Sequence, residues 1–146
     1  MKIYTFLLTL IMAFSFCSYE LKAQEGSSEI QLITKVITDY IEGSTKGQPD
    51  RLKKVFHKDL NLYYLRKNTL QTWTGDAYIA DTKEGKATGE SGEIISIDFE
   101  NDIATAKVQI LYPGAKTAYI DYFMLAKIEG QWTILHKMFT VKNLVQ

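Results

Sequence analysis

The sequence predicts an α+β domain in which helices come first and a mostly antiparallel sheet follows. Apolar residues recur at helical spacing from Ile30 to Ile41, and from Ile95 onward they alternate with a period of two. Turn-forming pairs such as Pro113-Gly114 separate the alternating runs. We therefore expect a cone of N-terminal helices packed on a curved sheet.

Residues 1–23 have the pattern of a secretory signal peptide. Lys2 precedes an apolar run that ends at Phe16 and is shorter than the roughly 20 residues that span a membrane. Ala23 offers a small residue for cleavage, so we expect export to the periplasm or the medium. The alternative is a lipoprotein attached through Cys17, although the bulky Phe16 before it disfavours that processing.

Residues 24–146 are long enough for one domain with a core of its own. The only cysteine leaves with the signal, so a disulfide or a thiol nucleophile is not expected. The 17 basic and 17 acidic residues leave no excess charge for nucleic-acid binding, and no membrane association is expected after cleavage. Two histidines far apart are no metal signature, and phosphate or dinucleotide motifs are missing. We predict no metal and no cofactor.

Three helices are expected. The first covers residues 28–41, with Gly43 placed to end it and Gly47 to turn the chain. Pro49 suits the first position of a second helix that reaches about Phe56. Thr74 can cap a short third helix.

Six strands are expected, at residues 60–64, 70–73, 95–99, 104–110, 117–128 and 132–141. The last two are apolar on both faces, which in an antiparallel sheet requires cover on both sides. Helices can cover one face, and we expect a second subunit to cover the other. The sequence thus predicts a homodimer formed through the sheet.

Four segments carry a resemblance to a known superfamily: DYIEG (39–43), VFHKD (55–59), YIDYFMLAKIEGQW (119–132) and KMF (137–139). In this order and spacing they resemble the NTF2-like superfamily, the cystatin-like cone also known as the SnoaL/ketosteroid-isomerase-like fold, and especially its lumazine-binding branch. The resemblance implies a pocket between helices and sheet. It implies no single activity, because this fold hosts isomerases, dehydratases, cyclases and binding modules.

Alignment with ketosteroid isomerases assigns roles by resemblance. Tyr40 falls at the oxyanion tyrosine and Asp121 at the oxyanion aspartate, while the base position falls on Tyr64. A phenol is a poor base at neutral pH. The isomerase reaction is therefore not implied, and an enzymatic role is disfavoured.

Asp121 stands in an apolar row with Tyr119, Phe123 and Leu125, so we expect its carboxyl group in the pocket, where burial favours the protonated form. Alternatively, it is a structural acceptor for a tyrosine or for His136, itself expected inside with Trp132, Ile134 and Met138.

Tyr40 can reach the pocket or pack in the core. His57 can act as an acid or base, or form a corner hydrogen bond. The alanines at 104 and 106 leave room for a ligand. The candidate pocket residues are Tyr40, His57, Tyr64, Trp73, Val108, Asp121 and Phe123.

Three functions are compatible with these residues. The first is an exported small-ligand-binding protein whose pocket takes a partly apolar or aromatic molecule, with Asp121 and Tyr40 as polar contacts. The second is an isomerase, dehydratase or cyclase that uses His57 or Asp121 for proton transfer. The third is a structural or partner-binding dimer whose cone is filled by its own side chains. An open pocket without a histidine close to Asp121 would favour binding.

Overall fold

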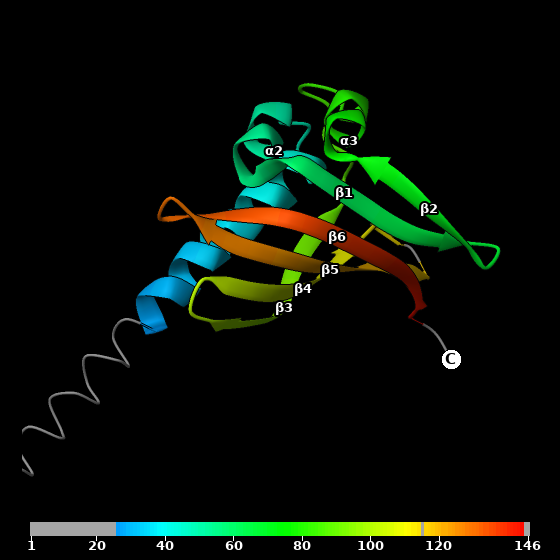
Figure 1. Ribbon diagram of the computed structural model, residues 1–146. Coiled ribbons are helices and arrows are strands. Elements are labelled where there is room, and N and C mark those ends of the chain that lie inside the picture. Colours follow the sequence, from blue (N-terminus) through cyan, green and yellow to red (C-terminus); the bar gives the residue numbers. More distant parts are fainter. Residues whose placement is uncertain (1–25, 115, 145–146) are drawn as a thin grey trace, which may run out of the picture. The chain divides into compact units, whose positions relative to one another are not determined.

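The computed structural model describes residues 26–114 and 116–144 (Figure 1). Residues 26–32 are helical and belong to a first unit; the second unit starts at Ile33, and the description below concerns that unit alone. The predicted signal peptide lies outside the described residues. In the described part of the chain, no helix is both long and apolar enough to cross a membrane.

The second unit contains helices and a six-stranded sheet, which confirms the predicted α+β class. Residues 33–45 are helical. The elements that follow are α2 (Pro49–Val55), β1 (Phe56–Arg66), β2 (Thr69–Thr74), α3 (Gly75–Asp81), β3 (Ser91–Glu100), β4 (Ile103–Leu111), β5 (Thr117–Ile128) and β6 (Gln131–Asn143). As predicted, Thr74 caps α3: its hydroxyl oxygen accepts a hydrogen bond from the Ala77 N–H at 3.2 Å.

The strands lie in the order β2-β1-β6-β5-β4-β3. All neighbours are antiparallel except β1 and β6, which are parallel. The hairpin turns fit this arrangement, because Lys67-Asn68 and Glu129-Gly130 both have positive φ at two successive residues. Such left-handed pairs match the twist of the flanking strands. The chain thus returns β6 to the middle of the sheet, beside both β1 and β5.

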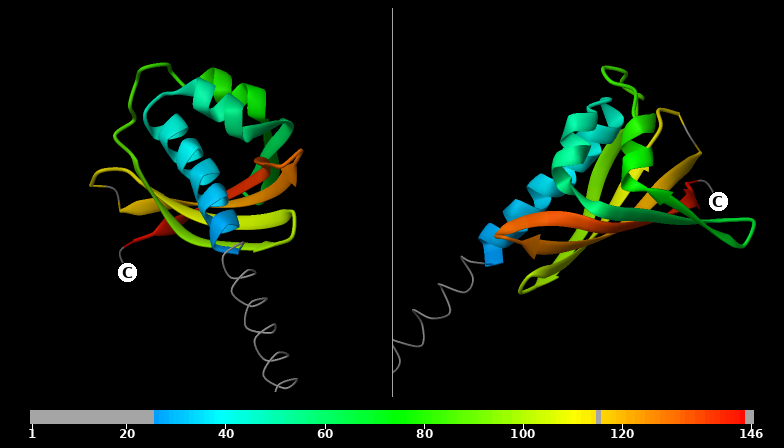
Figure 2. Two further views of the ribbon diagram at one scale, coloured as in Figure 1. Left: turned by 90° about the vertical axis from the view of Figure 1, so that its left-hand side faces the viewer. Right: turned by 45° about the horizontal axis from the view of Figure 1, so that its top comes forward.

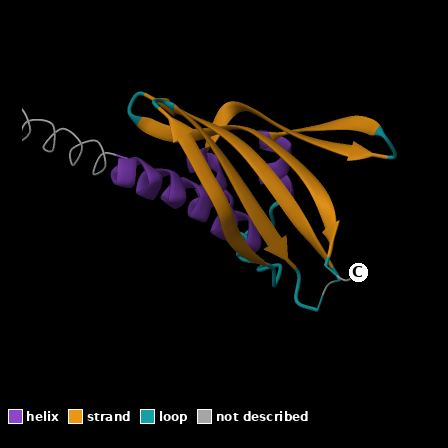
Figure 3. Cartoon of the chain, turned by 90° about the horizontal axis from the view of Figure 1, so that it is seen from below, coloured by secondary structure: helices purple, strands orange, loops and turns teal. Residues whose placement is uncertain are grey.

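One face of the sheet carries the core. Along β4 the side chains of Ala104, Ala106, Val108 and Ile110 are buried, and they belong to the same apolar cluster as Ile37 of the first helix. The helices lie over this face (Figure 2). Seen from below, the other face carries no helix of the second unit (Figure 3). The helices therefore cover one side of the sheet only.

Gly43 does not end the first helix, contrary to the sequence prediction, because helical residues continue to 45. A Cβ atom at Gly43 would lie 2.9 Å from two atoms of the Leu52 side chain. Glycine is needed here so that α2 can pack closely against the helix. As predicted, the chain turns at Gly47, where φ is +64°.

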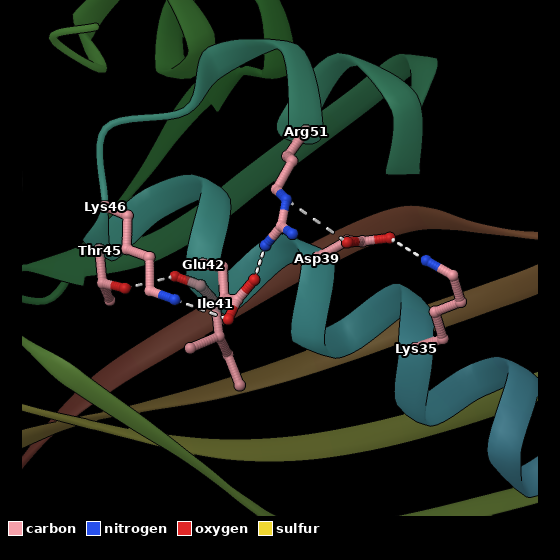
Figure 4. Close-up of polar contacts among 7 residues, drawn as sticks. All are labelled: Lys35, Asp39, Ile41, Glu42, Thr45, Lys46 and Arg51. Atoms are coloured by element: carbon pink, nitrogen blue, oxygen red, sulfur yellow. Dashed lines mark hydrogen bonds and ion pairs between the residues drawn. The ribbon is translucent and has the colours of Figure 1, made fainter. Parts of the chain in front are cut away.

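An ion-pair network fixes α2 on the first helix (Figure 4). Arg51 of α2 contacts the carboxylate of Glu42, and its Nε lies 3.7 Å from Oδ1 of Asp39. Lys35 and Lys46 pair with the same two carboxylates at 2.9 and 2.7 Å. Such partly exposed pairs each contribute about 1 kcal/mol or less. Through Arg51 they connect α2 to the helix turn that carries Tyr40.

Candidate functional site

A bulge in β6 determines which side chains of that strand face the core. Leu125 pairs with Ile134 and Met124 with His136, so Leu135 is an extra residue. Such a bulge shifts the alternation of side chains by one residue. Lys137 therefore points inward and is 5% exposed, whereas His136 and Met138 are exposed. The sequence predicted that His136 lies inside with Trp132, Ile134 and Met138. Trp132 and Ile134 are buried as predicted, but the prediction is wrong for His136 and Met138.

Lys137 meets two predicted site residues in the core. The Tyr40 hydroxyl donates a hydrogen bond to Oδ2 of Asp121 at 2.8 Å. The Lys137 ammonium donates to the Tyr40 hydroxyl oxygen at 2.5 Å and lies 2.9 Å from the same Oδ2. The side chains of Asp121 and Lys137 are 2% and 6% exposed. These three residues, which we call the polar triad, form a buried ion pair bridged by a phenol.

Aromatic rings surround the ammonium of the polar triad. Its Nζ lies 4.9 Å from the ring centre of Tyr40, 5.2 Å from that of Tyr78 and 5.4 Å from that of Phe139. A desolvated cation gains about 2 kcal/mol over such a ring face. Together with the Asp121 carboxylate, the rings compensate the cost of burying the charge. The sequence predicted that Asp121 is buried, but it did not predict the cation beside it.

Burial, and next the negative charge of Asp121, raise the pKa of Tyr40 well above its ordinary value. The folded protein therefore holds the phenolic proton more tightly than the unfolded chain does. Tyr40 acts as a neutral hydrogen-bond donor throughout the physiological pH range.

In Tyr40→Phe, the free energy of unfolding is expected to fall less steeply with rising alkaline pH than in the wild-type protein. Because the folded pKa is raised, the contribution of Tyr40 is fully present below the unfolded pKa of about 10 and is lost as pH rises above it, by up to about 1.4 kcal/mol per pH unit. Urea unfolding of both proteins between about pH 8 and about pH 11 measures the difference. The two proteins differ only at residue 40. Equal slopes of the free energy of unfolding against pH would therefore contradict the raised pKa of Tyr40.

A cavity of about 490 Å³ opens above the polar triad. Its apolar walls are mostly aromatic, and polar and charged side chains line its rim. The lining residues include Tyr40, Ser44, Trp73, Tyr78, Lys83, Lys86, Glu90, Ile110, Tyr112, Tyr119, Asp121, Lys137 and Phe139. Three predicted pocket residues, Tyr40, Trp73 and Asp121, thus line one cavity.

The other four predicted residues do not line this cavity, and two of them, Tyr64 and Phe123, line the groove described below. Val108 pairs with Asp121 across β4 and β5, and Phe123 packs its ring on Tyr40 at 4.7 Å; both are buried. Tyr64 stacks on Phe139 at 4.9 Å. His57 lies at the corner between α2 and β1, where its Nδ1 accepts from the Asp59 N–H at 3.3 Å. Ala104 and Ala106 are packed in the core, so they do not provide the open space.

Gly47 holds one edge of the cavity mouth. A Cβ atom there would lie 2.4 Å from the Lys83 carbonyl oxygen and 2.6 Å from that of Lys86. The backbone of this loop also bonds to the end of the first helix, from Gly85 N–H to Gly47 and from Thr88 N–H to Thr45, both at 2.9 Å. The rim is therefore fixed by backbone contacts.

A second hollow, a groove of about 920 Å³, lies mainly on the helix-free face of the sheet. Tyr122, Met124 and Met138 line it and are about half exposed, and His136 and Val141 line it as well. The groove is larger than the cavity but lacks a buried charged group such as Lys137. Its character is that of an apolar surface rather than of a polar small-molecule site.

Known proteins resemble this chain in sequence and fold. Residues 28–140 match the model of the family described as "Putative lumazine-binding". The aldolase FrzH of Cladobotryum sp. is 25% identical over 116 residues, which cover 77% of this chain and 91% of that protein. A solved NTF2-like protein of unknown function from Silicibacter pomeroyi has a TM-score of 0.69 at 23% identity, covering 80% of this chain and 98% of that one.

A second solved NTF2-like protein, from Methylobacillus flagellatus, has a TM-score of 0.66 at 26% identity and covers 79% of this chain and 93% of that one. The helices, the mixed six-stranded sheet and the cavity between them agree with that fold. The family match spans most of the chain, which confirms the resemblance drawn from the sequence. The chain belongs to the lumazine-binding family of the NTF2-like superfamily.

Proposed function

We propose that this protein binds a small, flat, aromatic molecule in the cavity above the polar triad. One observation carries the proposal: a cavity of about 490 Å³ combines aromatic walls with a buried ion pair at its base. Ligand pockets typically measure about 300–1,000 Å³ and pair apolar walls with a few polar groups that orient the ligand. The family description, which names lumazine binding, supplies a first ligand to test.

The lining residues divide into two roles. Trp73, Tyr78 and Phe139 offer ring faces and edges on which a flat ligand can stack. Asp121 and Lys137 offer hydrogen bonds at the base, with Tyr40 holding them in place. A cavity of this size does not support the third sequence hypothesis, a cone filled by its own side chains.

A lumazine titration tests the proposal. Bound lumazine would quench the fluorescence of Trp73, which lines the cavity, while Trp132 lies in the core. We expect saturable quenching that is largely lost in Trp73→Phe, although calorimetry would still detect binding by that variant. No heat and no quenching at millimolar lumazine would count against lumazine as ligand.

An enzyme of the isomerase, dehydratase or cyclase type is the second candidate. Asp121 and Lys137 form a proton acceptor and donor side by side, and the relative FrzH is named an aldolase. Neither histidine lines the cavity, which favours binding over proton transfer. Turnover of a carbonyl substrate that disappears in Asp121→Asn would favour the enzyme.

We propose further that two copies associate through the helix-free face of the sheet. Tyr122, Met124 and Met138 are each about half exposed there, although such apolar side chains are normally covered when they are contiguous. A second copy with the same face is the simplest cover, because dimers usually form by twofold symmetry.

Met124→Glu is expected to convert this dimer to a monomer at micromolar concentration, because it places two carboxylates in the apolar interface. Sedimentation velocity of both proteins measures the change. The control is Tyr112→Glu, a similarly exposed position that lines the cavity rather than the groove. A monomeric wild-type protein would refute the proposed association.

We also propose export, with cleavage after Ala23. N-terminal sequencing of the protein from its native cell envelope or medium should begin at Gln24. A lipid-modified Cys17 as first residue would establish the lipoprotein alternative instead.

A further inference from the structure

The polar triad leaves one hydrogen-bond donor and one acceptor unused. A lysine ammonium has three N–H donors: Lys137 gives one to the Tyr40 hydroxyl, and its ion pair with Oδ2 of Asp121, at 2.9 Å, occupies a second side of the ammonium. Among the described residues, none accepts the third. Oδ2 of Asp121 accepts from the Tyr40 hydroxyl and pairs with the Lys137 ammonium, whereas Oδ1 receives no hydrogen bond from the described part of the chain.

Tyr40 cannot supply a donor to a ligand. Its single proton is given to Asp121, and its oxygen accepts from Lys137. The hydroxyl therefore orients the other two residues. The groups left for a ligand are the third N–H of Lys137 and Oδ1 of Asp121, two neighbours that both belong to residues lining the cavity.

We infer that the base of the cavity recognises a neutral ring lactam, the edge in which a C=O group stands beside an N–H group. The carbonyl oxygen accepts from Lys137, and the N–H donates to Oδ1 of Asp121. This inference rests on the proposed function and names the ligand class of that site.

The charges of the triad favour a neutral edge over an ionic one. Lys137 and Asp121 cancel each other, so a carboxylate ligand would meet the charge of Asp121 and an ammonium ligand that of Lys137. A ligand without the N–H would leave Oδ1 of a buried carboxylate without a donor in the bound state. Unpaired buried polar groups of this kind carry a full desolvation cost. Tyr78 and Phe139, which flank the ammonium, then contact the rest of the ring system.

A matched ligand series tests the inference. The probes are the bicyclic lactam isoquinolinone, its N-methyl derivative and a C-methyl isomer of equal volume that keeps the N–H. We expect the lactam and the C-methyl isomer to bind at least about tenfold more tightly than the N-methyl derivative, because a hydrogen bond to a charged group is lost. Calorimetry measures all three affinities.

The variant Asp121→Asn provides a second test of the lactam inference. Its amide oxygen should take the place of Oδ2, because that position accepts the Tyr40 hydroxyl and faces the Lys137 ammonium. The amide NH₂ group then faces the ligand. The preference for the N–H ligands should then disappear. Equal binding of all three probes to the wild-type protein would overturn the lactam inference and leave the proposed function standing, as would an unchanged preference in Asp121→Asn. Failure of every probe and of lumazine to bind would overturn both.

Discussion

Replacing Lys137 with methionine is expected to lower the free energy of unfolding by about 3–5 kcal/mol. Methionine has a similar length and fills the space beside Tyr78 and Phe139. It removes the cation that lies 2.9 Å from Asp121, a residue only 2% exposed. The variant must therefore bury an unpaired carboxylate or protonate it. Chemical denaturation at neutral pH measures the loss.

The double variant Lys137→Met/Asp121→Asn is the matched control, since it removes both charges and keeps both shapes. We expect it to recover most of the lost stability. A single variant as stable as the wild type, or a double variant as unstable as the single one, would contradict a buried ion pair.

Phe123→Ala is expected to cost about 3–5 kcal/mol in the free energy of unfolding, because it empties a fully packed site in the core. Phe123 is 1% exposed, and its ring meets that of Tyr40 edge to face at 4.7 Å. The loss should also weaken ligand binding, because Tyr40 would no longer be held against Asp121.

Leu70→Ala is the comparison for this prediction, since Leu70 lies on the edge strand β2 and is 56% exposed. Its cost should stay below about 1 kcal/mol. Thermal or urea unfolding of both variants measures the contrast. A Phe123→Ala variant that unfolds like Leu70→Ala would mean that β5 does not present this residue to the core.

The fold was largely predictable because its signals are local. Alternation in β4, the turn at Pro113-Gly114 and the cap at Thr74 depend on residues close together in sequence. Gly43 was misread as a helix end because its reason is a distant contact with Leu52. Sequence spacing alone cannot distinguish a glycine that ends a helix from one that allows a second helix to pack closely against it.

The candidate site was predictable only in part. Tyr40 and Asp121 were found through apolar periodicity and resemblance, and they do meet. Lys137 was missed because strict alternation from Trp132 points it outward, and only the bulge at Leu135 turns it into the core. A bulge depends on the register with two neighbouring strands, which a single sequence does not reveal. The available signal was a lysine within a strand of mostly apolar residues.

A crystal structure of the protein grown with lumazine tests the central claim most directly. We predict density for the ligand in the cavity lined by Trp73, Tyr78 and Phe139, with polar atoms within hydrogen-bond distance of Lys137 and Asp121. Lumazine found only in the groove on the helix-free face, with the cavity filled by ordered water, would contradict it.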